Sequence, residues 1–144
     1  MRALQQEHVV LRVIAKMLVP MILLFALYVQ FHGDYGPGGG FQAGVIFASG
    51  IILYALVFGL SAARQVLPPP VVRRLAPLGV LLYAGVGVFS LLSDRAFLDY
   101  SAIDPEHPSH GQHLGILLVE LGVGITVASV MLMLFYSFAG RGRR

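Results

Sequence analysis

The sequence contains no cysteine and few charged residues. Without cysteine the chain has no disulfide, no thiolate metal site and no cysteine nucleophile. Only 12% of its 144 residues are charged, whereas 57% are hydrophobic. Soluble domains have about a quarter charged and about half apolar residues. This balance predicts an integral membrane protein.

Motifs of enzymes and of nucleotide-binding proteins are also missing. The chain has no Ser-His-Asp set, no pair of acids for glycoside chemistry and no redox-cofactor motif. Its glycine run lacks the Lys-Ser/Thr that follows a phosphate loop. The arginines are scattered over helix ends and do not form a stripe, which argues against nucleic acid as a partner. We therefore expect no enzymatic activity and no cofactor.

Three histidines recur at intervals of three residues, at His107, His110 and His113. On a helix they would stack loosely as metal or proton ligands. Pro105 and Pro108 argue against a regular helix there, so we expect a solvated connection and no metal site.

Four apolar stretches are long enough to cross a bilayer as helices, which takes about 20 residues each. They are residues 13–31, 41–62, 75–92 and 114–138. The first ends without a small-residue cleavage site, so we expect a retained membrane helix and not a signal peptide. Because backbone groups in lipid must be hydrogen-bonded internally, we expect an all-α fold with four transmembrane helices. They would form a single membrane domain over residues 1–144.

Charge placement predicts the orientation of these helices. The acidic residues concentrate in the first and third connections, whereas the basic residues lie near both termini and in the second connection. Basic residues favour the cytoplasmic side, so both termini are expected in the cytoplasm. Nine of the ten Lys and Arg residues lie near the termini or in the second connection, namely Arg2, Arg12, Lys16, Arg64, Arg73, Arg74, Arg141, Arg143 and Arg144. The first connection carries Asp34, and the third carries Asp94, Asp99, Asp104 and Glu106 with Arg95 as its one basic residue.

Glycine and proline define two of the connections. The glycine run within residues 32–44 predicts a tight reversal that leads into the second helix. The N–H groups of Gly39, Gly40 and Phe41 would form a positive helix end there. Residues 68–70 are all proline and predict a stiff, extended spacer. The residues assigned to the turn and helix-packing motif are Pro37, Gly38, Gly39, Gly40, Phe41 and Gly44.

Small residues form lines along the second and fourth helices at spacings that keep them on one face. Such faces allow helix backbones to approach closely in membranes. Two such faces in so small a protein predict packing against other subunits. The candidate subunit contacts are Ala48, Gly59, Gly115, Gly122 and Gly124.

Glu120 is an acidic residue inside the fourth apolar stretch. A charge at the bilayer centre costs at least about 2.5 kcal/mol on insertion scales. Such a carboxyl either binds and releases a proton on an ion pathway or fixes the packing of neighbouring helices. Both alternatives remain open from the sequence.

The segments Pro37-Gly38-Gly39-Gly40-Phe41-Gln42-Ala43-Gly44 and Val119-Glu120-Leu121-Gly122-Val123 resemble the MnhB family, the B-type subunits of the Mrp-type multisubunit sodium/proton antiporters. The resemblance covers nearly the whole chain. It implies a protein of the bacterial cell membrane that assembles with the other Mrp antiporter subunits, of types A, C, D, E, F and G. Such complexes export sodium ions in exchange for protons and serve sodium and pH homeostasis.

We therefore expect a membrane subunit of a cation/proton antiporter, with Glu120 as the protonatable candidate. One alternative is a purely structural subunit of that complex or of a related respiratory membrane complex. Another is a small exchanger that works by itself as a homodimer. Four-helix exporters of that kind carry their acid in the first helix, and this chain does not.

Overall fold

The structure is a computed structural model that describes the backbone of residues 2–33 and 36–141. It describes the side chains of residues 9–33, 36–107 and 109–141. Of the charges used above for orientation, Asp34, Arg143, Arg144 and the side chain of Arg2 lie outside the described residues. The helices are α1 (Arg2–His32), α2 (Gly40–Phe58), α3 (Leu60–Val66), α4 (Pro69–Leu92), the 3-10 turn η1 (Tyr100–Ala102) and α5 (Pro108–Ala139).

Four of these helices are long and apolar enough to cross a membrane. The candidate spans are Val9–His32, Gly40–Phe58, Pro69–Leu92 and Ser109–Ala139. The described residues form no strand. The expected all-α membrane fold is therefore confirmed.

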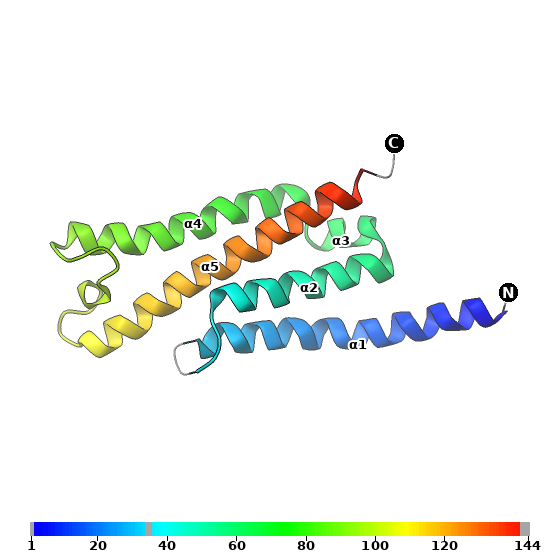
Figure 1. Cartoon of the computed structure of the whole chain (residues 1–144), viewed down its shortest axis with the longest axis horizontal. Coiled ribbons are helices and arrows are strands. Elements are labelled where there is room, and N and C mark those ends of the chain that lie inside the picture. Colours follow the sequence, from blue (N-terminus) through cyan, green and yellow to red (C-terminus); the bar gives the residue numbers. More distant parts are fainter. Residues whose placement is uncertain (1, 34–35, 142–144) are drawn as a thin grey trace.

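The four spanning helices lie in a row, in the order α1, α2, α5, α4 (Figure 1). The central helices α2 and α5 pack on each other, α1 packs on the outer side of α2, and α4 packs on the outer side of α5. The start of α1 and the end of α5 lie on the same side of the molecule, together with the short helix α3 (right in Figure 1). Because the described residues contain four candidate spans, the chain would leave the membrane on the side from which it entered.

Glycines set the close approach between α5 and its two neighbours. A Cβ atom built on Gly44 would lie 2.7 Å from the carbonyl oxygen of Gly124, and one on Gly79 would lie 2.5 Å from that of Gly122. Real Cβ atoms do not approach other atoms so closely, so these helices touch backbone to backbone. Small residues at interfaces serve this purpose in membranes, where lipid supplies no hydrophobic drive between helices.

The second helix is shorter than the sequence predicts. It ends at Phe58, and Gly59 separates it from α3. Gly59 has φ 99°, a value that residues with a side chain rarely adopt. The expected helix over residues 41–62 is thus wrong in its last turn, because the chain bends there to begin α3.

The expected proline spacer is also wrong for two of its three residues. Only Pro68 is extended, with φ −62° and ψ 140°, and it caps α4. Pro69 and Pro70 are the first residues of that helix. Proline suits the first turn of a helix because its missing N–H would have no helical acceptor there.

The last helix also begins with a proline, and it begins earlier than the sequence predicts. α5 begins at Pro108, not near residue 114, so His110 and His113 lie on a regular helix. The expected irregular connection at these histidines is therefore wrong. Pro108 begins the helix instead of interrupting it.

A buried tyrosine holds α3 against the end of α5. The Tyr136 hydroxyl lies 3.1 Å from the carbonyl oxygen of Leu67 and 3.4 Å from that of Ala63, and donates a hydrogen bond to them. Arg64 places its guanidinium 5.8 Å from the centre of the Tyr136 ring and hydrogen-bonds the Tyr136 carbonyl oxygen at 3.4 Å. These contacts fix the bend that follows Gly59.

Replacing Tyr136 by phenylalanine should destabilise the fold. The change removes a buried hydroxyl and leaves the carbonyl oxygen of Leu67 without this donor, at a cost of about 1 kcal/mol. We expect a lower midpoint of thermal unfolding in detergent. Tyr28→Phe is the control, because Tyr28 is exposed on α1. Equal midpoints for the two variants would contradict the assigned role of Tyr136.

Candidate functional site

The Glu120 carboxyl lies against the turn that joins α1 to α2. A Cβ atom built on Gly33 would lie 2.5 Å from Glu120 Oε1, and one built on Gly39 would lie 3.3 Å from the same oxygen. A Cβ atom on Gly40 would overlap the carbonyl oxygen of Glu120. Glu120 belongs to the Ser109–Ala139 span and is half-buried. The glycine turn therefore provides the space that this side chain occupies.

The turn is closed by the backbone. Gly36 N–H donates to the carbonyl oxygen of His32 at 3.1 Å, and Gly39 N–H donates to that of Val29 at 3.3 Å. A Cβ atom on Gly38 would lie 2.8 Å from the Val29 carbonyl oxygen. Gly39 has φ 134°, which also favours glycine. Glycine is thus needed here both for backbone conformation and for space.

The start of α2 gives the carboxyl a favourable electrostatic environment. Gly39 is the N-cap residue of α2 and has no side chain with which to cap the helix. A helix N-terminus carries roughly half a positive elementary charge and N–H groups without helical acceptors. The Glu120 carboxyl, next to Gly39, lies at this positive end. The predicted positive helix end and the predicted acidic residue thus meet in one place.

A cavity of about 260 Å³ opens beside Glu120, between α1 and α5. Its most buried polar group is Gln30 of α1, whose side chain is 5% exposed. Gln30 Nε2 is buried and has no hydrogen-bond partner among the described residues. The cavity is lined by Gln30, Phe31, His110, His113, Leu114, Leu117 and Glu120.

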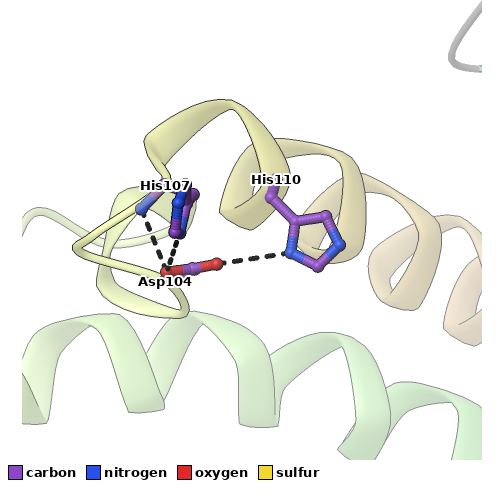
Figure 2. Close-up of polar contacts among 3 residues, drawn as sticks. All are labelled: Asp104, His107 and His110. Atoms are coloured by element: carbon purple, nitrogen blue, oxygen red, sulfur yellow. Dashed lines mark hydrogen bonds and ion pairs between the residues drawn. The ribbon is translucent and has the colours of Figure 1, made fainter.

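Asp104 connects the first turn of α5 with the preceding connection (Figure 2). Its Oδ1 accepts a hydrogen bond from the His107 N–H at 3.0 Å, and its Oδ2 lies 3.3 Å from His110 Nδ1. The His107 N–H is the main cause of a lowered pKa of Asp104, and His110 contributes in the same direction. Asp104 is therefore held as an anion that fixes the exposed His110 ring at the start of α5.

On the other side of Glu120, η1 packs against α5. A Cβ atom on Gly115 would overlap the Tyr100 ring. Burial is the main cause of a raised pKa of Tyr100, to which the nearby Tyr83 and Glu120 add. The hydroxyl of Tyr100 therefore stays neutral at neutral pH.

Comparison with known proteins identifies the family. A protein-family model described as "domain related to MnhB subunit of Na+/H+ antiporter" matches residues 10–133. The chain belongs to the MnhB family. A relative from Staphylococcus haemolyticus, named as an antiporter subunit, mnhB2, is 32% identical over 139 residues, which cover 95% of this chain and 98% of the relative. The Staphylococcus aureus (strain Newman) protein of the same name is 33% identical over 139 residues, which also cover 95% of this chain and 98% of that protein.

Both segments that carry the resemblance lie at the site of this MnhB protein. The motif from Pro37 to Gly44 forms the turn and the first turns of α2, and Glu120 contacts that turn from α5. Phe41 is exposed and points away from the core. Any role of these residues in ion transport stays a prediction.

The small residues predicted to contact other subunits make contacts within this chain. Ala48 is fully buried in the core, Gly122 packs on α4, and Gly124 lies against Gln30 and α2. Gly59 forms the break before α3, and Gly115 accommodates the Tyr100 ring. Their contacts with other subunits stay predictions.

The histidine series is divided between two environments. His107 caps α5, whereas His110 and His113 face the cavity beside Glu120. Within the described residues, no group of three or more His, Cys, Asp or Glu side chains could hold a metal ion. Sequence reasoning missed Gln30, whose signal was a polar residue at the end of an otherwise apolar run.

Replacing Gly40 by alanine should disrupt the packing of α2 on α5. The new methyl group would overlap the Glu120 carbonyl oxygen, and overpacking of this kind costs about 1–3 kcal/mol. We expect a lower thermal midpoint and less protein in the membrane. Gly85→Ala is the matched control, since its Cβ would meet nothing within 4 Å. If both variants behave like the unmodified protein, α2 and α5 do not pack as described.

Proposed function

We propose that this MnhB chain is the B-type subunit of a multisubunit sodium/proton antiporter and that Glu120 is a protonatable group on its ion pathway. The observation that carries the proposal is the position of the Glu120 carboxyl. It lies within a membrane span, at the positive start of α2 and beside a cavity that His110 and His113 also line. A carboxyl placed in this way can hold either a proton or a negative charge.

The environment of Glu120 favours proton exchange because it stabilises both forms. The start of α2 compensates the anion by about 0.3–1 kcal/mol, and by up to about 2 kcal/mol where the geometry is partly buried. The surrounding apolar residues Leu117 and Phe31 favour the neutral form. Balanced stabilisation is what a group that alternates between two protonation states requires.

The structural alternative also has support in the contacts of Glu120. Its carboxyl and its carbonyl oxygen both lie against the glycine turn, so the residue could serve only to hold α2 and α5 together. The two roles predict different effects of a neutral side chain of equal size at position 120. A positioning role tolerates such a side chain, whereas proton exchange does not.

Replacing Glu120 by glutamine should therefore lower transport without preventing assembly. We expect a sodium/proton antiport rate lower by about tenfold or more in membrane vesicles, which corresponds to about 1.4 kcal/mol in the barrier. The amount of assembled complex should stay unchanged.

Glu106→Gln is the control for this experiment. Glu106 is an exposed acid outside the spans, so its loss should leave the rate unaltered. Normal transport by assembled Glu120→Gln protein would overturn the proton-exchange role and favour the structural one.

We also propose that the protein lies in the bacterial cell membrane with both termini in the cytoplasm. Arg12 and Lys16 on α1, Arg64 on α3, and Arg73 and Arg74 on α4 support this orientation under the positive-inside rule. The exposed apolar face of α1 would then be available to the A-, C-, D-, E-, F- and G-type subunits.

This orientation is testable with fused reporters. A fluorescent protein that matures only in the cytoplasm should be bright after residue 141. Alkaline phosphatase, which is active only outside, should be active when fused within residues 93–107. The reverse pattern would contradict the orientation and place the Glu120 cavity on the cytoplasmic side.

A further inference from the structure

The cavity beside Glu120 has chemistry that the role of Glu120 alone does not explain. Four of its lining residues are polar or titratable, namely Gln30 from α1 and His110, His113 and Glu120 from α5. His110 lies near the start of α5 and is exposed, whereas Gln30 is buried. The cavity thus extends from the exposed start of α5 to Glu120 inside the membrane span.

The polar side chains of the lining indicate what fills the cavity. The Glu120 carboxyl and the rings of His110 and His113 can exchange hydrogen bonds with water, whereas lipid chains offer neither donor nor acceptor. A cavity of about 260 Å³ holds several water molecules at roughly 30 Å³ each.

The lining residues of α5 form a continuous line. His110, His113, Leu117 and Glu120 follow each other at steps of three, four and three residues. These steps keep all of them on one helix face, the one that borders the cavity. Asp104 anchors the outer end of this line through His110 (Figure 2).

We propose that this cavity is a water-filled vestibule through which protons pass between the surface and Glu120, with His113 as the intermediate proton carrier. The inference rests on the proposed proton exchange at Glu120. Histidine suits this role because its ordinary pKa lies near neutral pH. Each transfer moves one proton from His113 through water to the Glu120 carboxylate, or in the reverse direction, so charge and atoms are conserved.

Titratable groups on neighbouring elements border this route. His110 lies on the same helix, and Tyr100 of η1 and Tyr83 of α4 interact with the charge of Glu120 or with each other. Tyrosine hydroxyls ordinarily lose their proton only near about pH 10, so tyrosine is a poor proton carrier at neutral pH. The histidines are therefore the groups able to carry protons on the described part of the route.

The absence of cysteine allows a direct test of hydration. In the assembled antiporter, Leu117→Cys places a thiol on the wall of this cavity, and Leu118→Cys places one on the wall of a second cavity of about 350 Å³ beside α4, whose lining residues are all apolar. A charged, membrane-impermeant thiol reagent reacts with the thiolate, which forms only where water is present. The labelled mass of this chain is measured with the reagent on either side of the membrane.

We expect Leu117→Cys to react faster than Leu118→Cys by about tenfold or more, since one pKa unit changes the thiolate fraction tenfold. The reagent should act from the side that holds residues 93–107. Ser109→Cys, at the exposed start of α5, serves as the positive control. If Ser109→Cys reacts and Leu117→Cys does not, the cavity is dry and the proposal is overturned.

A second experiment tests the proton carrier. His113→Ala should slow sodium/proton antiport, and added imidazole should restore part of the rate, because a small diffusible base can replace the missing side chain. A purely structural defect would not respond to imidazole. A normal rate, or a lowered rate without rescue, overturns the role of His113.

The outcomes separate this inference from the proposed function. A labelled cavity with imidazole rescue supports the vestibule. A labelled cavity with normal transport in Glu120→Gln would leave the hydration in place and overturn Glu120 as its destination. An unlabelled cavity with impaired Glu120→Gln would retain Glu120 and overturn only the vestibule.

Discussion

The contact between Glu120 and the glycine turn is the constraint on which the rest of the structure depends. It brings an acidic side chain in a membrane span to the positive start of α2, where its charge has a compensating partner. The contact exists only because Gly33, Gly39 and Gly40 leave room for it. Since α5 also packs on α4 through Gly122, any displacement of α5 by a larger residue in the turn would be transmitted across the row of helices.

Hydropathy predicted the four spans, because the cost of exposing polar groups to lipid determines which stretches can cross a bilayer. Hydropathy did not predict the helix ends correctly, because glycine and proline determine where these helices begin and end. Pro69 and Pro108 begin helices that were expected to start later, and Gly59 ends one that was expected to continue. A proline does not by itself show where a helix lies. Pro69 and Pro108 occupy the first helical turn, which accepts proline readily, whereas Pro20 and Pro77 lie inside α1 and α4.

The parts of the site were predictable separately, but their contact was not. Glu120 was conspicuous as an acid in an apolar run, and the turn as a glycine run, yet neither pattern shows which helices are neighbours. The proximity follows from the order α1, α2, α5, α4, which depends on small-residue contacts such as Gly44 with Gly124. Gln30 gave almost no signal, because one amide near a helix end is ordinary until its neighbours are known.

The arrangement of helices in a row explains how so small a chain can take part in transport. A closed bundle would bury its acidic residue among four helices, whereas a row leaves every helix with uncovered faces. Here α1 is held mainly by α2 and contacts α5 at few positions, which leaves the cavity between α1 and α5 open. The cavity beside Glu120 lies at this sparse contact between α1 and α5. For a chain in the MnhB family, this position of the carboxyl supports its proposed role in proton exchange.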